Sequence, residues 1–194
     1  AQCIEAEDGT RRNSWRLAIL PYIQQQNLYD SFDRNQPWDS DHNLMVAAQL
    51  DPSVFQCPEN GEPYQYKMIK GYRIPVSSYI VITDNDGDDT PSTVFPGPNS
   101  FIRIADIVDG TSNTLMLIEV QGKYAPAWCE PVDIDIDTIR NRGINVSGGP
   151  GSYHPGGLNA AMCDGSVHFI SETIDPNTLN GILSRQGGEP IPDF

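Results

Sequence analysis

The segment from Leu158 to Ile170 constrains the fold more than any other part of the chain. Two runs of alternating apolar and polar residues flank the dipeptide Asp164-Gly165. An Asp-Gly pair between alternating runs favours a two-residue type I′ turn. The sequence therefore predicts a β-hairpin over residues 158–170.

Two further segments have strand character. Residues 78–83 are rich in β-branched and aromatic side chains, which fit a pleated sheet. Residues 114–120 form a nearly continuous apolar run, which is typical of a central strand. Few helical segments stand between successive strands, as parallel βαβ units would require. We therefore expect an α+β fold with a mainly antiparallel sheet, flanking short helices and long loops, in a single globular domain over residues 1–194.

Helical signals lie on both sides of these strands. Apolar residues recur at roughly helical spacing after a proline that suits a first turn, and aspartates that can act as N-caps precede two later segments. The expected helices are residues 21–32, residues 43–50 with Asp41 as the cap, and a last helix that starts at Pro176 after Asp175 and stops at Gly187-Gly188.

The charge balance excludes several classes of partner. The 194 residues carry 26 acidic and 12 basic side chains, for a formal net charge of −14. A surface this acidic repels nucleic-acid phosphates and anionic membranes. The sequence has no run of eighteen apolar residues, so nothing in it is expected to span a bilayer. The 17 glycines and 16 prolines predict a loop-rich protein.

Four cysteines, Cys3, Cys57, Cys129 and Cys163, are scattered along the chain, and none forms a CxxC pair. The spacing gives little support to a zinc or redox motif. One interpretation is one or two disulfides in an exported protein. The other is buried free thiols. The sequence does not choose among the possible pairings.

The acidic turn over residues 84–89 is the best candidate for a cation site. Asp84, Asp86, Asp88 and Asp89 lie around Gly87, and carboxylates on such a turn can converge on one Ca²⁺ ion. The spacing is not that of an EF-hand. A solvated acidic turn is the alternative. The Ca²⁺ hypothesis predicts a higher melting temperature with Ca²⁺, abolished by Asp86→Ala.

A second acidic pattern alternates with apolar residues at Asp133, Asp135 and Asp137. In a strand these carboxylates would share one face, about 7 Å apart. That separation is too large for two of them to share a proton, and a solvated strand face is the favoured interpretation. A second cation site is the alternative.

His154 and Asp164 suggest half of a hydrolase site, with Ser112 or Ser152 as the nucleophile. No G-x-S-x-G elbow is present, however, and Asp164 already has a role in the predicted turn. We therefore favour a structural role for His154, Asp164 and Gly165. The same interpretation covers the turn at Asp109, Gly110, Ser112 and Asn113, which is rich in side-chain acceptors.

Several segments, in order along the chain, resemble a bacterial family, the domain of unknown function 1559 (DUF1559) or H-x9-DG proteins. Nine residues separate His154 from Asp164-Gly165, as that name describes. The resemblance rests on residues 14–16, 20–22, 37–39, 42–43, 55–58, 78–79, 106–114, 119, 154–165 and 187–189.

Members of this family look like type IV pilin or type II secretion pseudopilin subunits. The resemblance implies a pilin-like head, periplasmic or extracellular, with other pilin-like subunits or secretion-system proteins as partners. The apolar anchoring helix with which members begin is not in this sequence, so membrane attachment is expected only in the full-length protein.

We therefore expect a non-enzymatic structural subunit of a filament or secretion assembly, with no cofactor apart from the Ca²⁺ considered above. Two alternatives stay open. One is an extracellular Ca²⁺-dependent module that binds carbohydrate or peptide, for which Trp128 and Tyr124 would supply an aromatic patch. The other is a hydrolase that uses His154.

Overall fold

The computed structural model describes residues 3–5, 11–61, 63–84, 92–97, 101–147, 149–188 and 190–192, with the backbone alone for residues 3–5 and 11–12. Its main sheet has five strands in the order β7-β5-β6-β8-β9. These are β5 (Tyr79–Thr83), β6 (Leu115–Glu119), β7 (Ile134–Asp135), β8 (Gly157–Met162) and β9 (Val167–Ser171). Every pair is antiparallel except β5 with β7. The α+β prediction is confirmed, and β6 lies at the centre of the sheet.

The predicted hairpin forms from β8 and β9, but its turn differs from the type I′ prediction. Gly165 has a φ of 88°, whereas Asp164 is not among the residues with positive φ. The Gly165 N–H donates to the Met162 carbonyl, and the Met162 N–H donates to the Ser166 carbonyl. This is a three-residue loop with glycine in the left-handed position, and it needs only one residue with positive φ.

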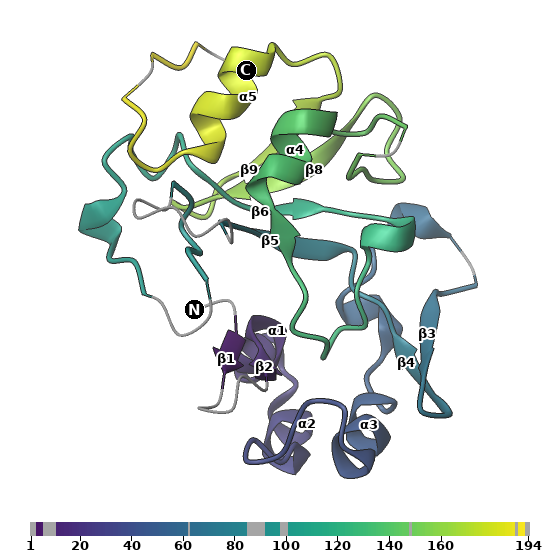
Figure 1. Ribbon diagram of the computed structural model, residues 1–194. Coiled ribbons are helices and arrows are strands. Elements are labelled where there is room, and N and C mark those ends of the chain that lie inside the picture. The colour runs from purple at the N-terminus through teal and green to yellow at the C-terminus, as the bar shows by residue number, and fades with distance from the viewer. Residues whose placement is uncertain are drawn as a thin grey trace.

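Two helices, α4 (Ile136–Arg142) and α5 (Pro176–Leu183), lie together on one side of the main sheet (Figure 1). The predicted cap of α5 is present, because the Asp175 carboxylate accepts from the N–H groups of Asn177 and Thr178. The helix ends at Ser184, before the glycine pair. Apolar residues of the sheet and of both helices form the larger core, which includes Ile118, Leu158 and Ile182.

The N-terminal part packs around a second core at the other end of the molecule (Figure 1). Its elements are β1 (Cys3–Glu5), β2 (Arg11–Ser14), α1 (Trp15–Ile19), α2 (Gln26–Ser31), α3 (Asp41–Ala47) and the hairpin of β3 (Tyr66–Ile69) with β4 (Tyr72–Pro75). Trp128 is fully buried in this core, stacked on Phe55 and edge-on to Phe32. Its indole N–H donates to the Ala47 carbonyl.

Short 3₁₀ helices complete the described structure: η1 (Leu20–Ile23), η2 (Pro52–Val54), η3 (Pro58–Asn60), η4 (Ile104–Asp106) and η5 (Gly122–Tyr124). The helix predicted from Pro21 to Phe32 is broken into η1 and α2, because Gln24 takes a left-handed conformation. The cap of α3 is Ser40 rather than Asp41, which is the first helical residue. Among the described residues, none of the helices has the length and apolar character needed to cross a membrane.

Candidate functional site

Three side chains that can bind a metal converge where the two cores meet. Cys57, Glu119 and His154 each offer one ligand atom, and these atoms all lie within 4.8 Å of one another. His154 Nε2 is 3.4 Å from Cys57 Sγ and 3.5 Å from Glu119 Oε1. The Cys57 residue is 2% exposed and the Glu119 side chain 3%, whereas the His154 side chain is 25% exposed. The cluster is thus buried on two sides and open at the imidazole.

Hydrogen bonds hold each of these residues in place. Cys57 and His154 are held through their backbone N–H groups, and Glu119 through its carboxylate. Cys57 immediately precedes η3, and its N–H donates to Ser78 Oγ beside β5. Glu119 ends β6, and its Oε2 accepts the backbone N–H of Asn159 on β8 at 2.8 Å. The His154 N–H donates to Ser152 Oγ. The arrangement is therefore fixed by the strands and the loops that join them.

The surroundings of Cys57 favour its neutral thiol form. Burial raises the pKa of the Cys57 thiol, and the nearby Glu119 carboxylate adds to this effect, although backbone hydrogen bonds from Glu59 and Asn60 oppose it. Burial, together with Glu119 and Cys57, raises the pKa of the Tyr79 phenol to about 12. Without a cation nearby, Cys57 is a thiol at neutral pH rather than an activated thiolate.

A pocket of about 370 Å³ lies beside the cluster. Its lining includes Glu119, Asn159 and Tyr79, with Leu117 and Val167 supplying apolar surface. The pocket thus borders the Glu119 side chain, which is itself almost fully buried.

The geometry fits a ligand set better than a nucleophilic dyad with its orienting group. In a catalytic Cys–His–carboxylate arrangement, the thiol and the orienting group contact different nitrogens of the ring. Here Cys57, Glu119 and the Asn159 amide all contact Nε2. One ligand atom each from Cys57, Glu119 and His154 lies within 4.8 Å of the other two, which is close enough for all three to bind one metal ion.

The structure does not bring the predicted pair His154 and Asp164 together through any described contact. Asp164 Oδ1 accepts from the N–H and hydroxyl of Ser166 in the hairpin turn. Of the two candidate nucleophiles, Ser152 donates its hydroxyl proton to the Gly157 carbonyl. Ser112 lies in the turn formed by residues 109–113. Neither serine hydroxyl therefore contacts the His154 imidazole in the described structure.

The turn at Asp109, Gly110, Ser112 and Asn113 lies against the hairpin turn. The Asp164 N–H donates to the Thr111 carbonyl. The Asp109 carboxylate accepts the N–H groups of Gly187 and Gly188 at 2.6 and 2.8 Å, and Gly110 has a φ of 93°. These motif residues join two turns and the C-terminal segment to one another.

The predicted Ca²⁺ turn falls mostly outside the described residues. Asp86, Asp88 and Asp89 are not described. Asp84 is buried, and its Oδ2 accepts from the N–H and hydroxyl of Ser92. The Ca²⁺ hypothesis stays a prediction.

The strand face predicted for Asp133, Asp135 and Asp137 is wrong. β7 spans only Ile134–Asp135, and the chain then enters α4 because the Asp135 carboxylate caps this helix by accepting the Asp137 N–H. Asp133 is buried in an ion pair with Arg16. The three aspartates instead have three different roles: Asp133 is a buried counterion, Asp135 is the N-cap of α4, and Asp137 lies in its first turn.

Cys57, Cys129 and Cys163 are free thiols in the structure, and the side chain of Cys3 lies outside the described residues. The structure thus gives no support to a disulfide among the three described side chains. The sugar-stacking patch proposed at Trp128 is wrong as well, since that indole is fully buried and has no face toward solvent.

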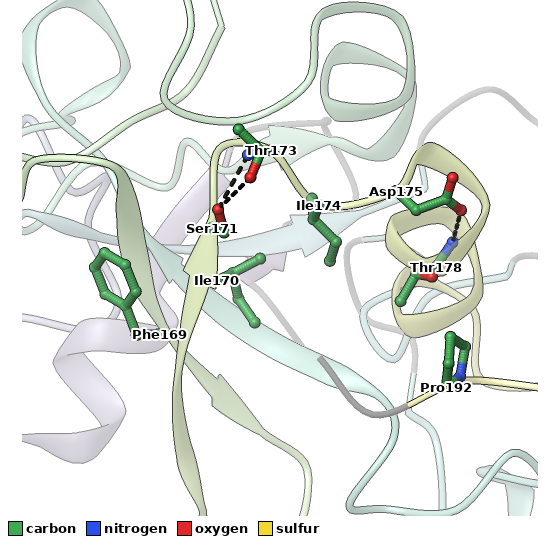
Figure 2. Close-up of a pocket in the computed structure, with 8 residues that line it drawn as sticks. All are labelled: Phe169, Ile170, Ser171, Thr173, Ile174, Asp175, Thr178 and Pro192. Carbon is green, nitrogen blue, oxygen red and sulfur yellow. Dashed lines mark hydrogen bonds between the residues drawn. The ribbon is translucent and has the colours of Figure 1, made fainter.

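A second pocket, of about 320 Å³, lies between the end of β9 and α5 (Figure 2). Its polar groups are engaged with one another: Ser171 with Thr173, and Asp175 with Thr178 as the helix cap. The remaining lining, such as Phe169, Ile174 and Pro192, is apolar. This pocket therefore lacks the converging ligand atoms that the cluster at His154 has.

The fold and the site together define a mixed α+β protein with a Cys–Glu–His cluster at the end of β6. The family model "Protein of unknown function (DUF1559)" matches residues 2–137 and 135–177, and the chain belongs to this family. No curated protein and no solved structure matches the chain.

Proposed function

We propose that this chain is the non-enzymatic head of a pseudopilin-like subunit in a periplasmic or extracellular filament or secretion assembly. In this proposal its partners are other pilin-like subunits or secretion-system proteins, and the full-length protein is membrane-anchored. Membership of the DUF1559 family and the ordered motifs that resemble pilin-like members support it.

The observation that carries the proposal is an apolar segment presented to solvent. Phe101, Ile104 and Val108 are 81%, 78% and 74% exposed, within eight residues of chain around η4. Large apolar side chains gathered in an exposed segment are typical of protein–protein contacts. The segment forms the teal turn at the left edge of the molecule (Figure 1).

The apolar segment is held at its C-terminal end. The N–H groups of Val108 and Asp109 both donate to the Arg185 carbonyl, and Arg185 Nη1 donates to the Asp106 carbonyl. Arg103 and Asp106 also form an ion pair within the segment. A segment fixed in this way binds a partner with little loss of conformational entropy.

The test is photo-crosslinking in the cells that produce the protein. A photoreactive amino acid at Phe101 should give adducts that contain a second copy or another pilin-like subunit. The matched control is Asn141, which is exposed on α4 away from η4. The variant Ile104→Ser should weaken the adduct at Phe101 without changing the melting temperature.

Two results would contradict the proposal. One is an absence of adducts from Phe101, or equal adducts from Phe101 and Asn141. The other is recovery of the protein in the cytosolic fraction.

A further inference from the structure

We propose that Cys57, Glu119 and His154 bind one Zn²⁺ ion. This site was not evident from the sequence, where the cysteines form no zinc motif and the acidic turn at residues 84–89 was the favoured cation site. The proposal is independent of the assembly role, because it concerns a buried cluster rather than the exposed segment around η4.

Two of the three separations between the ligand atoms match a tetrahedral zinc ion. With Zn–S of about 2.3 Å and Zn–N and Zn–O of about 2.1 Å, the expected separations are about 3.6 Å for S···N and about 3.4 Å for N···O. The separations in the structure are 3.4 Å for Cys57 Sγ to His154 Nε2 and 3.5 Å for His154 Nε2 to Glu119 Oε1. The third pair, Cys57 Sγ and the Glu119 carboxylate, lies within 4.8 Å.

The donor set selects the metal. A thiolate and an imidazole are ligands for zinc and other transition metals, whereas Ca²⁺ and Mg²⁺ prefer oxygen alone. The thiolate and the carboxylate together carry two negative charges, which one Zn²⁺ neutralises. Neutralisation matters here because Cys57 and Glu119 are almost fully buried, where an uncompensated charge is costly.

Three polar groups lie around the ring nitrogen that would bind the ion. His154 Nε2 is 3.0 Å from the Asn159 amide nitrogen, 3.4 Å from Cys57 Sγ and 3.5 Å from Glu119 Oε1. A metal ion takes the single lone pair of Nε2, so zinc binding would replace the contact between Nε2 and the Asn159 amide.

Neighbouring groups orient the ligands, as is usual in zinc sites. The Asn159 N–H holds Glu119 Oε2 and leaves Oε1 toward the site. Ser78 fixes Cys57 through its backbone, and Ser152 fixes His154 in the same way. His154 is one-quarter exposed, so a water molecule can occupy the fourth position and the ion has a path from solvent.

Binding changes the protonation of one group. The Cys57 thiol loses its proton to solvent as the sulfur–zinc bond forms. The affinity for zinc should therefore rise with pH.

The first test uses Co²⁺ as a spectroscopic substitute for Zn²⁺ in the chelator-treated full chain. We expect one Co²⁺ per chain, with a thiolate-to-cobalt charge-transfer band in the near ultraviolet that added Zn²⁺ removes. Cys57→Ser should lose the band and His154→Ala should weaken binding at least tenfold. Cys163→Ser and His42→Ala change a thiol and an imidazole outside the cluster and should leave the titration unchanged.

The second test needs no variant, so it holds even if Cys57→Ser does not fold. Zn²⁺ should raise the melting temperature of the chelator-treated full chain, and Mg²⁺ at the same concentration should not. An unchanged melting temperature with Zn²⁺, or Co²⁺ binding without a charge-transfer band, would overturn the proposal.

Discussion

Arg16 and Asp133 show how much of the architecture depends on single buried polar residues. The guanidinium is fully buried and donates to the Tyr79 carbonyl as well as to the Asp133 carboxylate. Asp133 Oδ1 accepts from Arg16, from the Trp15 indole and from the Val81 N–H, whereas Oδ2 has no hydrogen-bond partner among the described residues. One carboxylate oxygen thus connects α1, β5 and the segment before β7.

We predict that Asp133→Ala lowers the free energy of unfolding by about 3–5 kcal/mol, since it leaves Arg16 buried without its partner. Asp133→Asn should cost less, because the amide oxygen can still accept the hydrogen bonds from Arg16, the Trp15 indole and the Val81 N–H. Urea unfolding at pH 7 measures both. Asp137→Ala, in the exposed pair with Arg140, is the control and should change stability by less than about 1 kcal/mol. Equal losses for the two Asp133 variants would refute this account.

The pH dependence at this position follows from burial. Desolvation, only partly offset by Arg16, raises the pKa of Asp133 from 3.8 to about 6. The folded state then binds this proton more tightly than the unfolded state, so the contribution of Asp133 to stability falls as pH rises from 3.8 to about 6.

The measurement is the difference in unfolding free energy between the wild type and Asp133→Asn across this range. The difference should decline by at most about 1.4 kcal/mol per pH unit between pH 3.8 and about 6, and it should be constant at higher pH. Parallel profiles for the two proteins would contradict the raised pKa.

At the scale of elements, the β8–β9 hairpin depends on one glycine. A Cβ at Gly165 would meet no atom within 4 Å, so any cost of substitution comes from its φ of 88° alone. We predict that Gly165→Ala lowers stability by about 1 kcal/mol, and that Gly165→Asn costs less because asparagine tolerates the left-handed region. Urea unfolding of both variants checks this. An alanine variant as stable as the wild type would show that the turn changes conformation.

The sequence predicted those elements whose signals are local. The strands β5 and β6 were predicted from short runs of strand-forming residues. The helix α5 was predicted from the Asp175 cap followed by Pro176, and all three elements are present. Asp133, Asp135 and Asp137 misled the prediction because an alternating pattern does not distinguish a strand from a cap followed by a helix. The pattern lacked the information that Arg16, 117 residues away, needs Asp133 as its partner.

The candidate site was predicted only in part, for the same reason. His154 was singled out by its motif, and Cys57 and Glu119 lie in segments that carried the family resemblance, but nothing local joins them. Cys57 and His154 are 97 residues apart, and only the sheet brings them together.

For the whole molecule, the two cores raise the question of whether they unfold together. They are joined by the contacts of Arg16 with the Tyr79 carbonyl and by the hydrogen bond from the Ser78 N–H to the Phe55 carbonyl. We predict one cooperative transition, as expected for the single domain inferred from the sequence.

The three tryptophans allow a direct measurement. Trp38 and Trp128 belong to the N-terminal core, and Trp15 begins α1, so fluorescence reports that core. Far-UV circular dichroism also reports the main sheet and α5. Urea midpoints from the two probes should coincide, whereas separate midpoints would indicate two independently unfolding units.

The Arg16–Asp133 pair also has a consequence for synthesis on the ribosome. The arginine leaves the exit tunnel long before its counterion, 117 residues later, has been added. Until then the Arg16 side chain on α1 has no carboxylate to pair with, so the nascent N-terminal core cannot adopt its final packing. Completion of that core is thereby coupled to translation of the segment leading into β7, and ribosome-bound chains stopped before residue 133 should remain sensitive to proteases near Trp15.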